Sequence, residues 1–334
     1  MWSIRNQTPY AVDSTWARSK DGEPEWIVAV KGTFDIRSDG EIVLAEEQLP
    51  PLIAPEYNSE DALSSLRYDA DLVGAKPTTD IVVNGTAYAP NRRPSSDFLV
   101  GMKVGPVQKV IRVRGDRRWD EGSGKGCSAP EPVMQVPLLY ERAYGGYDSA
   151  DPDPRNQRFD SRNPAGCGVV ADPMRRAGQL LPSFEYPEGK LEAAGPAGFG
   201  AIDSFWSPRL ELWGTYDAAW ERGRKPLLPD DWDPGANLCS PADQRPKSHL
   251  HGGDLVELMN LTPYGRLTFR LPRVHLGFNT RIHKSTQEHR GQLSTIVIEP
   301  DHQRVLMVWL TSLPCSADVD YLEETVVRSK EILR

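Results

Sequence analysis

The feature that most restricts the fold of this chain is a two-residue alternation of apolar and polar side chains near both of its ends. In residues 26–36 the even positions are mainly apolar, whereas the odd positions include Lys31, Thr33 and Asp35. Successive side chains of a strand point to opposite faces, so this pattern predicts a strand with one face buried. A turn at residues 38–40 (SDG) leads into a second predicted strand at 41–45, which indicates a hairpin.

Similar patterns predict further strands in the first and last thirds of the chain. They lie at residues 79–88, 98–104, 107–114, 255–261, 266–271, 293–299 and 305–311. The segment 305–310 (VLMVWL) is apolar on both faces, which is typical of a central strand.

The middle of the chain, about residues 115–246, lacks this periodicity. It is dense in Gly, Pro, Asp, Arg and Trp, and the acidic, proline-containing segment 148–155 excludes a helix or a central strand there. Trp206, Trp213, Trp220 and Trp232 indicate long loops held by aromatic anchors, because disordered segments contain few aromatic residues.

Two segments favour helices. Residues 213–220 predict a short one, and Asp318 is a suitable N-cap for a helix at the end of the chain. Beyond that cap, apolar side chains fall near helical spacing at Val319, Leu322, Val326 and Leu333.

We therefore expect a mainly β protein with antiparallel sheets packed as a sandwich or distorted barrel, long Gly/Pro-rich loops and a C-terminal α-helix. The pattern divides the chain into an N-terminal β region (1–120), a loop-rich central region (121–250) and a C-terminal β region with its helix (251–334). These regions form one continuous domain or two abutting β units.

The charge and cysteine content restrict the partners and the compartment. A formal net charge of −8 argues against non-specific binding to nucleic acid or to an anionic membrane. No apolar stretch is long enough for a membrane helix, and no signal peptide is visible at the start. The four cysteines form no closely spaced pair, so we expect a cytoplasmic protein.

No residue pattern points strongly to catalysis or to a cofactor. His249 and His251 form a His-x-His pair that could face one ion from a strand, but no second spaced pair supports a metal site. A nucleophile-elbow sequence is absent, and no cysteine lies in surroundings that would select it as a thiolate. We therefore expect no catalytic residue, no metal and no cofactor.

Uncommon sequence phrases occur in a fixed order along the chain. They are LRYDADL (66–72), KPTTD (76–80), GDRRW (115–119), ERAYGG (141–146), NPAGCG (163–168), PAGFG (196–200), WSPR (206–209), GTYD (214–217), LLPDD (227–231) and ADQR (242–245). Together they resemble the bacterial family DUF2169 over about residues 1–310. The usual Phe-Gly-Gly of that family reads Tyr-Gly-Gly at 144–146.

The resemblance implies a function. Members of the family are encoded beside type VI secretion spike genes and act as accessory adaptors or chaperones for toxic effectors. It therefore implies a non-enzymatic, cytoplasmic adaptor whose partners are a toxic effector protein and spike (VgrG/PAAR-type) proteins. The alternative is a carbohydrate-active hydrolase or lectin-like β protein that uses Trp-lined loops and acidic residues.

The phrases supply the candidate site residues, which serve either as partner contacts or as scaffold. They are Arg142, Tyr144, Gly145, Gly146, Asn163, Phe199, Trp206, Arg209, Tyr216, Trp220, Asp231 and Arg245. Trp, Tyr and Arg are enriched at interface hot spots, whereas glycines more often serve unusual backbone angles.

Overall fold

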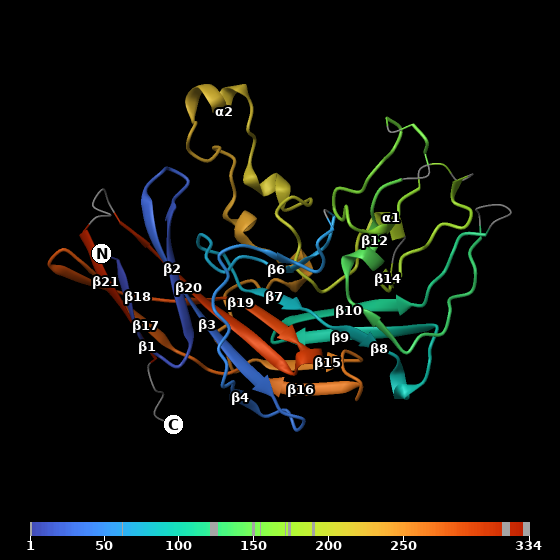
Figure 1. Cartoon of the computed structure of the whole chain (residues 1–334), viewed down its shortest axis with the longest axis horizontal. Helices are drawn as coiled ribbons and strands as arrows, with labels where there is room; N and C mark the ends of the chain where they lie inside the picture. Colours follow the sequence, from blue (N-terminus) through green and yellow to red (C-terminus); the bar gives the residue numbers. More distant parts are fainter. Residues whose placement is uncertain are drawn as a thin grey trace.

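The computed structural model of this chain describes residues 2–61, 63–120, 126–148, 151–153, 155–170, 172, 175–188, 191–315 and 321–329. Strands dominate, and long loops connect them (Figure 1). The predicted mainly β class with antiparallel sheets is therefore confirmed.

The largest sheet has six strands in the order β2-β3-β20-β19-β7, with β4 also paired to β3. They are β2 (Ala11–Arg18), β3 (Pro24–Ile36), β4 (Ile42–Leu44), β7 (Asp80–Val83), β19 (Gln292–Glu299) and β20 (Arg304–Pro314). The predicted hairpin is the antiparallel pair of β3 and β4. The predicted central strand is also confirmed, because β20 lies between β3 and β19 and is buried along most of its length.

A second sheet has five antiparallel strands in the order β14-β10-β9-β15-β16. They are β9 (Asp97–Val104), β10 (Val107–Arg114), β14 (Phe184–Glu185), β15 (Leu255–Met259) and β16 (Arg266–Arg270). In β10 the buried side chains alternate along the strand as Val107, Lys109, Ile111 and Val113. The alternation that predicted this strand thus also places a lysine in its buried series.

The third sheet has four strands in the order β1-β21-β17-β18. They are β1 (Ser3–Gln7), β17 (Leu276–Ile282), β18 (Ser285–Arg290) and β21 (Leu322–Ser329).

The predicted C-terminal helix is wrong for Leu322–Ser329, which forms the strand β21. Its centre contains β-branched Thr325, Val326 and Val327, which favour a strand, and it pairs with both β1 and β17. The expected N-cap Asp318 lies outside the described residues, as do Val319 and Leu333.

Short elements occupy the loops. Three two-stranded sheets pair β5 (Glu56–Tyr57) with β6 (Leu66–Tyr68), β8 (Thr86–Tyr88) with β11 (Gln135–Pro137), and β12 (Tyr144–Gly145) with β13 (Cys167–Gly168). The α-helices are α1 (Leu191–Ala194) and α2 (Ala218–Gly223). The short 3-10 helices are η1 (Pro90–Arg92), η2 (Tyr140–Arg142), η4 (Leu210–Trp213), η5 (Pro234–Asn237), η6 (Ala242–Gln244) and η7 (Pro300–His302).

The helix predicted at 213–220 therefore has different bounds. The side chain of Asp217 accepts hydrogen bonds from the backbone N–H groups of Ala219 and Trp220, both at 2.9 Å. This capping fixes the start of α2 at Ala218, after η4 has ended.

The three large sheets share one hydrophobic core. Its cluster of buried side chains includes Val28 and Met307 from the six-stranded sheet, Val100 and Leu258 from the five-stranded sheet, and Phe278 from the four-stranded sheet. Each sheet is open in its strand order, and none closes into a barrel within the described parts of the chain. Strands from the first and last thirds are neighbours in the core, because β3 pairs with β20.

Candidate functional site

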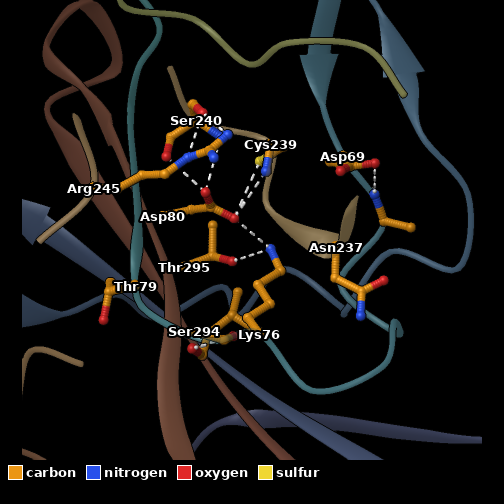
Figure 2. Close-up of polar contacts among 12 residues, drawn as sticks. Asp69, Lys76, Thr79, Asp80, Asn237, Cys239, Ser240, Arg245, Ser294 and Thr295 are labelled. Carbon is orange, nitrogen blue, oxygen red and sulfur yellow. Dashed lines mark hydrogen bonds and ion pairs between the residues drawn. The ribbon is translucent and has the colours of Figure 1, made fainter. Parts of the chain in front are cut away.

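The most highly connected polar group among the motif residues is the carboxylate of Asp80, the first residue of β7 (Figure 2). Asp80 is fully buried. Its Oδ1 accepts hydrogen bonds from the backbone N–H of Ser240 at 2.8 Å and from the Ser240 hydroxyl at 2.7 Å. Its Oδ2 lies 2.8 Å from the Nζ of buried Lys76 and also accepts from the backbone N–H of Cys239 at 3.1 Å. We refer to these four residues as the Asp80 cluster.

The electrostatics of the Asp80 cluster favour a permanent ion pair. Burial alone would raise the pKa of Asp80, but the charge of Lys76 and hydrogen bonds from Lys76 and Ser240 outweigh it and lower the pKa below its ordinary value. Burial alone would lower the pKa of Lys76, but Asp80 outweighs it and raises that pKa. Both groups are therefore charged at neutral pH.

The thiol of Cys239 belongs to the same cluster but stays protonated. Burial and the neighbouring Asp80 carboxylate raise the pKa of Cys239 well above its ordinary value. The Sγ atom lies 3.6 Å from Asp80 Oδ2 and donates to it. This thiol is thus a buried hydrogen-bond donor rather than a nucleophile.

A second layer of contacts joins the KPTTD phrase to other parts of the chain. Lys76 Nζ donates to the hydroxyl of Thr295 on β19 at 2.9 Å. The Thr79 hydroxyl donates to the carbonyl of Leu293 at 2.6 Å and accepts from the backbone N–H of Leu250 at 2.9 Å. The half-buried Arg245 from the ADQR phrase donates to the carbonyl of Ser240. The bonds from Ser240 to Asp80 and from Leu250 to Thr79 hold the end of the central region against the six-stranded sheet. Figure 2 shows the contacts of Asp80 and Lys76.

The WSPR and PAGFG phrases are also internal. Arg209 is buried, and its guanidinium donates to the carbonyls of Ala236 and Ile202 and pairs with Asp69 at 2.7 Å. Trp206 is buried and packs edge-on against Tyr140 with ring centroids 5.6 Å apart. Phe199 is completely buried.

The ERAYGG and NPAGCG phrases form one turn system around Asn163. Gly145 and Gly146 have φ angles of 148° and 84°, which favour glycine. Buried Asn163 donates to the carbonyls of Tyr140 and Tyr144 at 2.8 and 3.1 Å. Tyr144 is buried too, as part of β12.

Arg142 lies beside this turn system and is less enclosed. Its side chain is about two-fifths exposed and pairs with Asp116 at 3.1 Å. The surface position of this pair makes it a weak contributor to stability.

Comparison with known families assigns the chain. The model of a family described as an uncharacterized protein conserved in bacteria (DUF2169) matches residues 21–310. The chain belongs to DUF2169. No curated protein and no solved structure matches this DUF2169 protein.

The remaining candidate residues of the DUF2169 protein lie on a projecting arm, which we define as residues 214–233 and which contains α2 (yellow, Figure 1). Tyr216 is 52% exposed, and its ring packs edge-on against Trp220. Asp231 is exposed and accepts from the backbone N–H and hydroxyl of Thr215 at 2.9 and 2.7 Å. The half-buried Trp220 donates its indole N–H to the carbonyl of Leu227.

The arm is fastened to the turn between β2 and β3. Arg224 donates to the Lys20 carbonyl at 3.0 Å and pairs with Asp21 at 2.7 Å. Gly22 on the same turn lies so close to Leu227 that an added Cβ would come within 2.5 Å of its Cδ2 atom. The arm is thus an attached element whose outer side chains face solvent.

Other exposed aromatic side chains lie on the central loops. Tyr147 and Phe159 are 47% and 52% exposed, and their rings stack with centroids 5.2 Å apart. Phe205, which directly precedes the buried Trp206, is 74% exposed. We refer to Tyr147, Phe159 and Phe205 as the loop aromatics.

The histidine pair does not gain further ligands. His249 is partly buried and burial lowers its pKa, whereas His251 is exposed. Within the described residues, no group of three His, Cys, Asp or Glu side chains is arranged to hold a metal ion. None of the helices described is long and apolar enough to cross a membrane.

Sequence reasoning did not select the members of the Asp80 cluster as site residues. Lys76 and Asp80 belong to the KPTTD phrase, but the phrase does not show that both side chains are buried. Cys239 and Ser240 carried no signal, since their contacts with Asp80 arise across about 160 residues of sequence.

Proposed function

We propose that this DUF2169 protein is a non-enzymatic adaptor or chaperone that binds a type VI secretion effector and helps to load it onto the spike complex. The observation that supports this proposal is a difference in burial between the motif residues and the aromatic residues on the same loops. Asn163, Phe199, Trp206 and Arg209 are buried as framework, while aromatic side chains on the same loops remain exposed.

The exposed aromatics suit reversible protein binding. Tyr216 on the arm and the loop aromatics are large apolar surfaces held on anchored backbone, and such residues dominate interface energies. Their anchoring limits the conformational entropy that binding would cost. We expect the complex to form in the cytoplasm and to dissociate when the effector is passed to VgrG/PAAR-type spike proteins.

The carbohydrate alternative has less support. It requires aromatic platforms and paired acids in one cleft. An open pocket of about 770 Å³ contains Asp35, Glu46 and Glu47 in its wall, but its lining includes no Trp, Tyr or Phe side chain. This pocket therefore does not combine acidic side chains with the tryptophans of the central loops.

The test is co-expression with the toxin-like protein encoded next to the gene, followed by pull-down and size exclusion. We expect a stable complex, and an effector that is insoluble or degraded when expressed alone. Changing the three loop aromatics to Ser together should weaken the complex at least about tenfold, since an aromatic side chain buried at an interface contributes more than about 1 kcal/mol to binding.

The matched control is Tyr264→Ser, because Tyr264 is at least as accessible (75% exposed) but lies on the β15–β16 turn. It should leave the complex intact, and neither variant should change the thermal midpoint. Absence of a complex with the neighbouring effector and with the spike proteins would refute the proposal.

A further inference from the structure

A cavity of about 460 Å³ opens beside the junction of β18 and β19. Its floor is apolar and includes Trp309, Leu276 and Leu293. His251, His275 and Arg290 add polar side chains to its wall, and all three are exposed. The volume lies within the range of about 300–1,000 Å³ typical of small-molecule sites.

The lining carries the positive charge of Arg290. No Asp or Glu side chain lines the cavity. Within the part of the chain that the structure describes, no carboxylate forms an ion pair with Arg290, His251 or His275. The cavity thus combines an apolar floor with donor groups that have no internal acceptor, in a protein whose net charge is −8.

The cavity is built by the framework described above. The Thr79 hydroxyl bonds both Leu250 and Leu293, which are two of its lining residues, and so fixes their separation. Gly291 packs against the floor: an added Cβ would lie 2.8 Å from Phe278 and 3.4 Å from the Cβ of Trp309. A side chain at this position would therefore displace the floor.

We propose that this cavity binds a carboxylate carried on an apolar body. The apolar part would cover Trp309 and Leu276, while the carboxylate would accept hydrogen bonds from Arg290 and His275. Such a ligand is either a free aromatic or aliphatic acid or the C-terminal carboxylate of a peptide that ends in an apolar residue. The site lies apart from the arm and the loop aromatics in sequence, and the proposal does not depend on the adaptor function.

The first test is titration calorimetry of the full chain with 2-naphthoate, using the neutral 2-naphthamide as the comparison. We expect the acid to bind at least about tenfold more tightly than the amide, because charge-assisted hydrogen bonds exceed neutral ones by about 1 kcal/mol or more. Added salt should weaken binding of the acid but not binding of the amide.

Variants locate the site. Arg290→Gln and His275→Gln should each weaken 2-naphthoate about three- to tenfold, as loss of one charge-assisted contact predicts. Val274→Trp should abolish binding of both acid and amide by filling the cavity, since Val274 is a partly exposed lining residue. Arg266→Gln, an exposed arginine on β16, is the control and should leave binding unchanged.

The second test replaces the free acid by a short peptide that ends in Phe, with its C-terminal amide as comparison. The proposal is supported if either acid binds and if Arg290→Gln, but not Arg266→Gln, weakens that binding. Whichever of the two acids binds more tightly identifies the source of the carboxylate. The proposal is overturned if neither acid binds at millimolar concentration, or if binding does not distinguish acid from amide. If the full chain binds naphthoate but forms no complex with the effector or the spike proteins, only the adaptor function is refuted.

Discussion

At the scale of single residues, the Asp80 cluster illustrates why a buried ion pair is sensitive to the loss of one member. Asp80 and Lys76 are both withdrawn from water, and each depends on the other and on uncharged donors for compensation. Removing one charge leaves the other buried without a counter-charge, which costs more than the pair itself contributes.

We therefore predict that Asp80→Asn lowers the free energy of unfolding by about 3–5 kcal/mol. Urea denaturation measures this change. Asp230→Asn is the control, because that carboxylate is 88% exposed and should matter little. The double variant Lys76→Met/Asp80→Asn should be more stable than Asp80→Asn, and a double variant that is less stable would contradict the ion-pair explanation.

The same pair predicts a pH dependence with a defined sign. In the folded protein the pKa of Asp80 lies below its ordinary value, so the stabilisation is fully present above that ordinary value and is lost as the pH falls through the folded one. The stability difference between the wild type and Asp80→Asn should be constant above about pH 5 and shrink below about pH 4. Urea titrations across this range would contradict the assignment if the difference grew in acid.

Glycine in the Tyr-Gly-Gly turn gives a second residue-scale prediction. At Gly146 the φ angle is 84°, and an added Cβ would lie 2.1 Å from the carbonyl oxygen of Gly166. Gly178 has a similar φ of 74° but open space around it. Gly178→Ala should cost about 1–2 kcal/mol from the backbone angle alone, whereas Gly146→Ala should cost more than about 3 kcal/mol. Equal losses in denaturant unfolding would show that the close approach is unimportant.

At the scale of elements, local alternation was sufficient for strands whose two faces differ and for the apolar central strand. It located β3, β10, β19 and β20 to within a few residues. It was insufficient for β21, where apolar spacing also fits a helix and where the deciding factor is pairing with β1 and β17. That pairing depends on residues 40 or more positions away, so no local pattern contains it.

The candidate site shows the same limit. The phrases identified residues that are important to the fold, including Arg209 and Asn163, but a phrase does not reveal whether a side chain points inward. Burial of these two residues follows from three-dimensional contacts. Their identity was readable from sequence, whereas their role as framework was not.

The arm provides the element-scale prediction. Arg224→Ala removes the bonds from the arm to Lys20 and Asp21. Amide hydrogen exchange in Ala218–Gly223 should accelerate about tenfold, which corresponds to about 1.4 kcal/mol, while the global unfolding midpoint changes little. Arg222→Ala is the matched control, since Arg222 Nε donates to the Ala218 carbonyl within the same helix. Unchanged exchange in Arg224→Ala would mean that other contacts hold the arm.

At the scale of the whole molecule, the structural unit is larger than the family match. Residues 21–310 exclude β1, β2, β21 and the end of β20. Yet β2 pairs with β3 along eight residues, and the indole N–H of buried Trp26 donates to Thr325 on β21 at 2.9 Å.

A fragment limited to residues 21–310 is therefore predicted to lose its cooperative fold. Removing these strands uncovers β3 and costs at least about 5 kcal/mol, which is comparable to the total stability of a domain. Near-ultraviolet circular dichroism and urea unfolding should show the loss of fixed packing. A fragment that unfolds at the same urea concentration as the full chain would contradict this expectation.

Because β3 pairs with β20, the newly made chain must wait for β20 to be synthesised before this pairing can form. The first residue of β20 is synthesised 280 residues after the first residue of β3. At about 5–20 residues per second, β3 leaves the ribosome roughly 15–55 s before its partner exists. During that interval a strand with apolar residues on both faces has one edge unpaired, which is the condition that favours aggregation of nascent chains. We therefore expect the chain to be especially prone to aggregation while it is still being synthesised.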